Sequence, residues 1–174
     1  MKPNIGKGDK GETVVLNGKI DKASPLLGLI GKLDILNSFV GFSRSFCKNN
    51  KELDKILKDI QSDIFIMSSQ LAGSRDKKLG KEAVEKLEKY ITQFEKEIEP
   101  LNKFIYPTGT TLSASLHVVR SICRDVEREA FLVAKNYDVP QEILSYLNRL
   151  SDLLFVLARV VNKRSSIEDE KWNV

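Results

Sequence analysis

The chain has 174 residues, 41% hydrophobic and 30% charged, which suits one domain with a full core and excludes an intrinsically disordered protein. Its net charge of +4 suits a polyphosphate ligand or nucleic acid, but 24 acidic residues are interspersed with 28 basic ones, so charge does not choose between them. Two cysteines and one histidine exclude a disulfide framework, a cysteine-ligated zinc and a histidine-based metal site.

The first 23 residues are rich in glycine and lysine. Gly6 to Gly11 match the pattern G-x-G-x-x-G letter for letter, but five preceding residues leave little room for the strand of a dinucleotide-binding fold, and no βαβ pattern follows. A Walker loop is excluded because Gly-Lys-Ser/Thr is missing at the required spacing. Two interpretations stay open, a flexible basic loop that aims amide groups and lysines at phosphate, or a disordered tail.

Helical periodicity dominates the remainder of the chain. Ser24 and Pro25 form a helix start, with serine as N-cap and proline at the first position. Apolar residues then recur every three or four positions, and they predict helices at about 24–47, 52–71, 84–98, 112–133 and 145–161. The third helix stops at Pro100, and Asn136–Gln141 separates the last two. These helices predict an all-α bundle.

Two features of the first four helices point to function. Asp34 lies among apolar neighbours on the first helix and is expected to pair with an arginine. Arg120, Arg124 and Arg128 follow at i, i+4 and i+8 along one flank of the fourth helix, beside Glu127. Such arginines repel one another unless an anion meets them, and the guanidinium fork suits phosphate. Salt bridges to acidic residues of neighbouring helices are the alternative.

The fifth helix is the centre of the predicted bundle. It is apolar on most sides, so we expect it to be buried on most sides. Because unpaired buried polar groups are costly, each of its polar residues should have a partner, namely Asn148, Arg149, Asp152 and Arg159. Cys123 lies on an apolar stripe and is expected to be a core thiol.

No signal peptide opens the chain, and no apolar run approaches the ~20 residues of a membrane span. This predicts a cytoplasmic protein without a membrane partner. We expect a single domain over 1–174, with an N-terminal loop at 1–23, a helical bundle at 24–164 and a polar tail at 165–174.

Four blocks of sequence together resemble the PduO-type ATP:cob(I)alamin adenosyltransferases. They span nearly the whole chain and comprise Gly8–Thr13 with Lys22, Gly31–Ser38, Phe104–Pro107 continuing through His117, Arg120, Arg124, Glu127 and Arg128, and Tyr146–Asp152 running on to Arg159. The last block is the most specific. The resemblance implies a five-helix bundle that forms a homotrimer, with active sites between subunits. It also implies transfer of the 5′-deoxyadenosyl group of ATP to cobalt(I) of a corrinoid, with release of triphosphate.

The resemblance also implies roles for individual residues. The triphosphate, with Mg²⁺ assisting, would be wrapped by Ile5, Gly6, Lys7, Gly8, Asp9, Thr13, Val14 and Lys22. Arg124, Glu127, Arg128 and Asn148 of the neighbouring subunit would hold ATP. Arg120 would pair with Asp34 across the interface. Phe104 would press on the lower corrin face and keep water or the dimethylbenzimidazole base off cobalt, which eases reduction of cobalt(II).

Several positions depart from the family pattern. Ile5-Gly6-Lys7 stands where the family has Thr-Lys/Arg-Thr/Asn, which removes hydroxyls and shifts a lysine. Ile35 replaces a glutamate, and Thr108 replaces a glycine. Asp125 replaces an arginine and lowers the local positive charge.

Two other functions are weighed against the enzyme. One is a corrinoid- or nucleotide-binding escort without turnover, suggested by the altered N-terminal loop. The other is a helical adaptor or nucleic-acid binder that uses the basic surface. We prefer the enzymatic function. It predicts no nucleic-acid partner, and it makes a reductase or a cobalamin-dependent enzyme a possible protein partner. The residues that would ligate a metal are not identified by the sequence.

Overall fold

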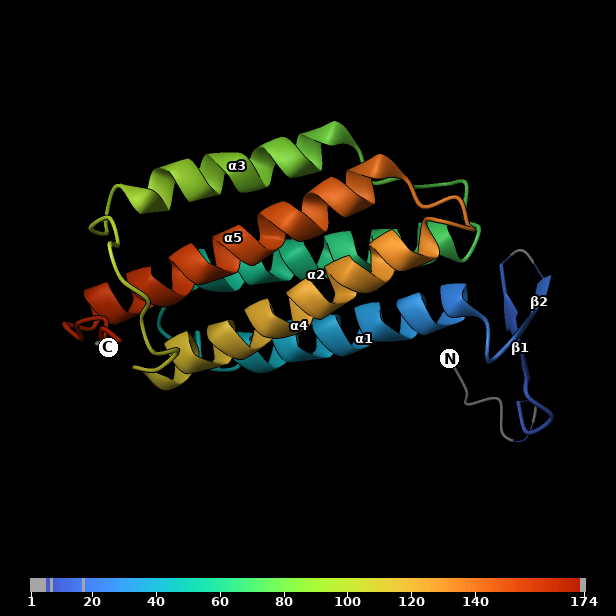
Figure 1. Ribbon diagram of the computed structural model, residues 1–174, viewed down its shortest axis with the longest axis horizontal. Helices are drawn as coiled ribbons and strands as arrows, with labels where there is room; N and C mark the ends of the chain where they lie inside the picture. The colour runs from blue at the N-terminus through green and yellow to red at the C-terminus, as the bar shows by residue number, and fades with distance from the viewer. Residues whose placement is uncertain (1–5, 7, 17, 173–174) are drawn as a thin grey trace.

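The computed structural model describes residues 6, 8–16 and 18–172 and forms an elongated helical bundle (Figure 1). Its helices are α1 (Pro25–Arg44), α2 (Lys51–Leu71), α3 (Lys81–Glu95), α4 (Thr111–Val133) and α5 (Gln141–Arg164). Helix α5 packs against α3 and α4, while α1 packs against α2 and α4. The expected five-helix bundle is confirmed, and sequential helices run in opposite directions (Figure 1).

Helix α5 provides much of the core, as its apolar periodicity predicts. Its aliphatic residues from Ile143 to Val161 are buried, and Tyr146 is fully enclosed. Cys123 is also fully buried, and burial raises the pKa of its thiol far above the ordinary range, as expected for a core thiol. A helix surrounded on most sides gives its polar residues fixed neighbours, so α5 can hold side chains of a site in place.

Local signals explain where the helices begin. Pro25 occupies the first turn of α1 after Ser24, which makes no side-chain capping bond. The side chain of Thr110 accepts a hydrogen bond from the amide of Ser113 and caps α4. Helix α5 begins at Gln141, earlier than expected, because Pro140 precedes it at the N-cap position. Helix α3 ends at Glu95, three residues before the expected end.

The turn before α4 is held by Asn162 of α5. The Asn162 side chain accepts a hydrogen bond from the Thr110 amide and donates one to the carbonyl oxygen of Thr108. Gly109 has φ of +124°, and a β-carbon there would collide with Asn162. This close approach fastens the segment that carries Phe104 to the end of α5.

The described part of the N-terminal segment contains two short strands. Strands β1 (Glu12–Val15) and β2 (Gly18–Asp21) pair antiparallel as a hairpin at one end of the bundle (Figure 1). Thr13 is paired with Ile20, and Gly18 has φ of +115°, so glycine permits the tight reversal. The chain is mostly helical, as expected, but the sequence did not predict this hairpin, because strands of four residues are too short to give a clear periodic signal.

Helix α1 is long and apolar enough to cross a membrane by length and composition, with a mean hydropathy of 1.3. This corrects the expectation that no apolar run approaches that length. In the bundle, the side chains of Leu29, Leu33 and Leu36 are fully buried. Its other face and the turn after it carry exposed apolar side chains, here called the apolar ridge, at Ile35, Phe39, Phe42 and Phe46. Phe42 contacts Phe39 and Phe46 edge-on.

Candidate functional site

The three arginines of α4 differ in their surroundings. Arg124 is exposed and makes no hydrogen bond or salt bridge with any described residue. Arg128 is exposed as well, and its Nη2 donates to Asp125 Oδ1 at 3.1 Å. Arg120 is half-buried, and its Nε has no hydrogen-bond partner among the described residues. The alternative, salt bridges to acidic residues of neighbouring helices, therefore holds for none of the three in the described structure, because the partner of Arg128 lies on α4 itself.

A chain of hydrogen bonds crosses α4, α5 and α3 beside these arginines. Asn148 Nδ2 donates to Glu127 Oε1 at 2.9 Å, and Arg149 Nη1 donates to Asn148 Oδ1 at 2.7 Å. Arg149 Nε in turn donates to Glu88 Oε1 at 2.9 Å. Two residues expected in the site, Glu127 and Asn148, are thus brought together and held in a defined orientation.

Arg120 lies in a second cluster around Phe155. The guanidinium groups of Arg120 and Arg159 each lie 5.9 Å from the Phe155 ring centroid, and His117 meets the same ring edge-on at 6.0 Å. Burial and then the charge of Arg120 lower the pKa of His117. Burial also lowers the pKa of Arg120, with a further contribution from Arg124. Arg120 therefore has no carboxylate partner among the described residues, whereas Arg159 of the same cluster is paired with Asp169.

Most polar residues of α5 have the partners that the sequence predicts. Arg159 Nε donates to Asp169 Oδ2 at 2.6 Å, and its Nη2 donates to the carbonyl oxygen of Glu99. Asp152 is the exception, because it is exposed and makes no hydrogen bond with a described residue. Burial nevertheless raises the pKa of Asp152, and Glu127 raises it further.

The expected partner of Asp34 is absent from its own chain. Asp34 is exposed on α1 and forms no hydrogen bond or salt bridge with the described part of the chain. The adjacent Lys32 instead ties α1 to α4, because its Nζ lies 2.9 Å from both Asp125 Oδ2 and Glu129 Oε2. Within one chain, Asp34 and Arg120 therefore both lack the partner that each was expected to have.

The expected phosphate loop lies on and beside the β-hairpin. Gly8 lies close to the Lys22 side chain, since a β-carbon on Gly8 would be 2.7 Å from Lys22 Nζ. Thr13 and Val14 lie on β1, with Val14 75% exposed, and Gly6 and Asp9 join the adjoining turn. Ile5 and Lys7 fall outside the described residues. No hydrogen bond or ion pair links residues 8–16 and 18–22 to α4 or α5 in the described structure.

Phe104 is 76% exposed, and the C-terminal tail holds its backbone. The Trp172 amide donates to the Phe104 carbonyl oxygen at 2.8 Å, the Tyr106 amide donates to Glu170, and Ile105 bridges to Lys171. We call residues 168–172 the C-terminal strap. The sequence analysis treated this segment as a polar tail and missed its role; the one available signal was Trp172, the single tryptophan of the chain.

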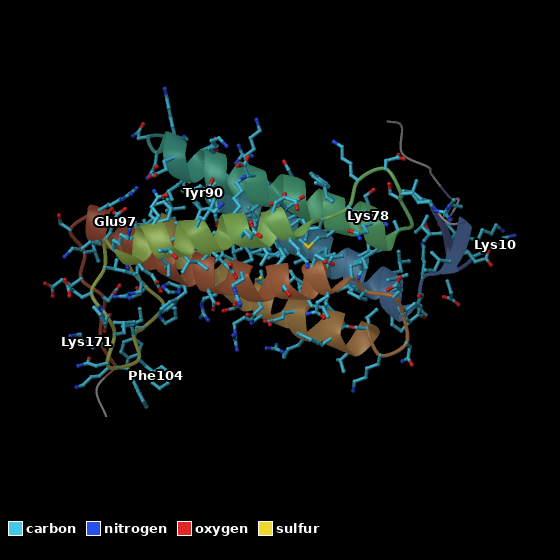
Figure 2. The ribbon with its side chains drawn as sticks, turned by 90° about the horizontal axis from the view of Figure 1, so that it is seen from above. Lys10, Lys78, Tyr90, Glu97, Phe104 and Lys171 are labelled. Atoms are coloured by element: carbon cyan, nitrogen blue, oxygen red, sulfur yellow. The ribbon has the colours of Figure 1, made fainter. Side chains whose placement is uncertain are left out.

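One chain does not assemble the whole expected site. Figure 2 places Lys10 of the N-terminal segment at one end of the bundle and Phe104 with Lys171 at the other. A hollow of about 530 Å³ lies beside the strap, and another of about 390 Å³ runs between α3 and α5 past Asp152 and Phe155. Arg124 and Arg128 line neither. No cluster of three metal-ligating side chains occurs among the described residues.

Comparison with known proteins gives one consistent result. A family model described as cobalamin adenosyltransferase matches residues 4–161. A corrinoid adenosyltransferase of Bacillus subtilis (strain 168) is 37% identical over 178 residues, which cover 99% of this chain and 92% of that protein. A cobalamin adenosyltransferase of Cupriavidus metallidurans is 32% identical, covering 95% of this chain and 90% of that one.

Solved structures agree with the sequence relatives. A variant of the PduO-type ATP:corrinoid adenosyltransferase from Lactobacillus reuteri, complexed with cobalamin and ATP, superposes with a TM-score of 0.91. It is 30% identical, and the match covers 99% of this chain and 100% of that chain. A second variant of the same protein, complexed with ATP, gives the same TM-score and identity over 98% of this chain.

Proposed function

The chain belongs to the cobalamin adenosyltransferase family, and we propose that it transfers the 5′-deoxyadenosyl group of ATP to the cobalt of a corrinoid. Cobalt(I) attacks C5′ of ATP, a cobalt–carbon bond forms, and the bond between C5′ and the phosphate oxygen breaks. Both electrons of the new bond come from cobalt(I), which becomes cobalt(III), and triphosphate leaves with the electrons of the broken bond. Because the metal of the substrate is the nucleophile, the protein supplies position and charge stabilisation.

The arginine flank of α4 carries the proposal. Negative charge develops on the triphosphate as it leaves, and Arg124 is an exposed guanidinium without a carboxylate partner in the described structure. Arg128 lies one turn further along and reaches the same side. Glu127, held by Asn148 at 2.9 Å, provides a fixed acceptor for the hydroxyl groups of the ribose or for the base. These four residues would bind ATP.

The N-terminal segment would close over the phosphates. Its glycines leave backbone amides accessible, and Lys22 adds a positive charge beside Gly8. The remaining contacts would come from Asp9, Thr13 and Val14, with Ile5, Gly6 and Lys7 completing the wrap. Mg²⁺ would arrive bound to ATP and be held chiefly by phosphate oxygens, since Mg²⁺ commonly binds through substrate phosphates with one or two carboxylates.

A homotrimer with active sites between copies is the proposed assembly. Two observations support it: Asp34 and Arg120 each lack a partner in the described part of the chain, and the apolar ridge of α1 lies exposed beside Asp34. A neighbouring copy would cover the ridge and pair Asp34 with Arg120, which removes the cost of the unpaired Nε. The separation of Lys10 from Phe104 within one chain also favours a site shared between copies.

Phe104 would form the lower wall of the corrin site. Its ring is exposed although its backbone is fixed by Trp172, as expected for a side chain that meets a ligand. An apolar ring below cobalt excludes water and the dimethylbenzimidazole base. Cobalt(II) without an axial ligand is easier to reduce, so this wall would assist formation of the nucleophile.

Formation of adenosylcobalamin tests the function directly. The protein, ATP–Mg²⁺ and cobalamin under a strong reductant should give the visible spectrum of adenosylcobalamin, at a rate proportional to protein concentration. Binding of both substrates without turnover would instead support the escort function.

A mixing experiment tests whether sites lie between copies. Lys22→Ala removes the N-terminal contact, and Arg124→Ala removes the α4 contact, so each variant alone should be nearly inactive. Co-expressed in equal amounts, they should recover about a quarter of the wild-type activity, because one interface in four then combines an intact loop with an intact α4. No recovery would place both residues in a site within one chain. A cytoplasmic location and a reductase partner are further proposals, to be tested by cell fractionation and by co-purification from cells.

A further inference from the structure

Asp125 lies between the α4 arginines that are proposed to bind ATP. Its Oδ1 accepts a hydrogen bond from Arg128 Nη2 at 3.1 Å, and its Oδ2 accepts one from Lys32 Nζ at 2.9 Å. Lys32 is itself tied to Glu129 at 2.9 Å. The carboxylate of Asp125 is therefore held from α1 while it occupies one edge of the Arg128 guanidinium.

We infer that Asp125 competes with the phosphates of ATP for Arg128 and thereby lowers the affinity of the site for polyphosphate. This inference rests on the proposed function, because it takes Arg128 as a phosphate contact. Asp125 acts through Arg128 and would not touch the substrate, so it is a positioning residue. The ligands affected are those with a triphosphate, namely ATP and the released product.

The electrostatics support a permanently charged competitor. The hydrogen bond from Lys32 lowers the pKa of Asp125, and the bond from Arg128 lowers it further, so the carboxylate is ionised at neutral pH. Lys32 is 35% exposed and Arg128 66% exposed, so solvent screens both contacts. The Asp125–Arg128 pair is therefore weak enough for a phosphate to replace it.

This competition has a consequence for turnover. Free triphosphate carries at least as much charge as the triphosphate of ATP, but it has no adenosine to hold it in the site. A fixed carboxylate beside Arg128 repels both ATP and free triphosphate. Because triphosphate has no adenosine group to bind elsewhere in the site, it is held less strongly than ATP. Asp125 would thus favour product release at the expense of ATP affinity.

The test compares two variants that remove the same charge. Asp125→Asn keeps the shape and frees Arg128, whereas Glu129→Gln loses a carboxylate that contacts Lys32 at the same distance but is not bonded to Arg128. Binding of ATP–Mg²⁺ and of inorganic triphosphate is measured by calorimetry at low salt. Asp125→Asn should tighten ATP binding about two- to fivefold, and it should tighten triphosphate binding at least as much. Glu129→Gln should leave both unchanged.

Two further measurements complete the test. The increase in ATP and triphosphate affinity of Asp125→Asn should largely vanish at high salt, because the Asp125–Arg128 pair is exposed and salt screens it. Product inhibition by triphosphate should become stronger in Asp125→Asn. Equal tightening in both variants would show a general surface-charge effect and overturn the inference, as would unchanged or weaker binding in Asp125→Asn. These results are separable from failure of the proposed function, in which the wild-type protein itself would not bind ATP or form adenosylcobalamin.

Discussion

The indole ring of Trp172 lies edge-on to the ring of Phe104, with centroids 6.2 Å apart and planes inclined by 64°. Edge-to-face contact at this distance is favourable for aromatic pairs. The backbones of the two residues are also joined by a 2.8 Å hydrogen bond. The last described residue of the chain thus determines how the exposed Phe104 ring is presented.

Removing the Phe104 ring should separate ATP binding from corrinoid chemistry. For Phe104→Ala we expect unchanged ATP affinity, because the ring is proposed to contact the corrin and the α4 residues to bind ATP. Adenosylation that starts from cobalt(II) should collapse, since water or base can then reach cobalt. Calorimetry with ATP and a spectroscopic assay of cobalt coordination check these two expectations. Full activity with the cobalt(II) substrate would contradict the assigned role.

Trp172→Ala should reproduce part of this effect without changing Phe104. Loss of the ring contact allows Phe104 to take other rotamers, so activity from cobalt(II) should fall about tenfold or more, as misplaced groups typically cost. Trp172→Phe, which keeps an aromatic edge, should restore most of the activity. If both variants behave like the wild type, the strap does not position Phe104.

Arg124→Ala should weaken ATP binding far more than it weakens folding. Charge-assisted hydrogen bonds are the stronger kind, and loss of one or two should lower ATP affinity about 10- to 100-fold. The free energy of unfolding should change by no more than ~0.5 kcal/mol, because Arg124 is exposed and unpaired within the described residues. Arg75→Ala on the α2–α3 connector is the matched control for loss of charge. Parallel losses of stability and affinity would instead indicate a structural salt bridge.

The buried Arg159–Asp169 pair should be important for stability. Asp169 is 16% exposed, and Arg159 is 8% exposed, so Asp169→Ala leaves a buried guanidinium with only the Glu99 carbonyl. We expect a loss of about 3 kcal/mol in the free energy of unfolding. Glu88→Ala breaks the exposed pair with Arg149 and should cost less than ~1 kcal/mol. Urea denaturation of both variants compares the pairs, and similar losses would refute the distinction.

Tyr146 should stabilise the fold through Asp63 in a pH-dependent way. The Tyr146 hydroxyl donates to Asp63 Oδ2 at 2.8 Å, and burial raises the pKa of Asp63 despite this bond. Tyr146→Phe removes the donor and should cost about 1–3 kcal/mol at neutral pH. Because the folded-state pKa of Asp63 is raised, ionisation of Asp63 lowers the free energy of unfolding as pH rises through that pKa. The Tyr146 hydroxyl stabilises the ionised carboxylate, so the loss of stability in Tyr146→Phe should shrink as pH falls towards ~4 and Asp63 becomes protonated.

The matched control for this prediction is Asp63→Asn. The amide oxygen still accepts from Tyr146, and no charge is buried, so this variant should be at least as stable as the wild type at neutral pH. If the loss of unfolding free energy in Tyr146→Phe stays constant with pH, Asp63 is not the group that makes the stability pH-dependent.

Periodicity predicted the bundle because helices with apolar stripes have few ways to bury them. It placed Leu147, Leu150 and Leu154 of α5 in the core, where all three are fully buried. It missed the β-hairpin, since each strand spans four residues and only Thr13 and Val15 on β1 are half-buried. Helix α1 was recognised as a helix, but its exposed apolar ridge was not, because a stripe does not reveal which of two apolar faces points inward.

The site was predictable only in part. The spacing of Arg120, Arg124 and Arg128 predicted that they share one flank of α4, and in the structure Asn148 donates a hydrogen bond to Glu127 at 2.9 Å. The pairing of Asp125 with Lys32 was not foreseen, because the two residues are 93 positions apart, on α4 and α1. The strap was not foreseen either, because backbone pairing between Phe104 and Trp172 leaves no periodic signal.

By itself, the sequence determined which segments are helical, which face of α5 is buried and which residue types gather along α4, since all three follow from spacing along one element. Only the tertiary structure decided that Arg124 has no partner among the described residues, that Lys32 of α1 contacts Asp125 of α4, and that Trp172 contacts Phe104. These outcomes depend on contacts between residues far apart in the chain, which form only when the packed helices bring their ends and flanks together.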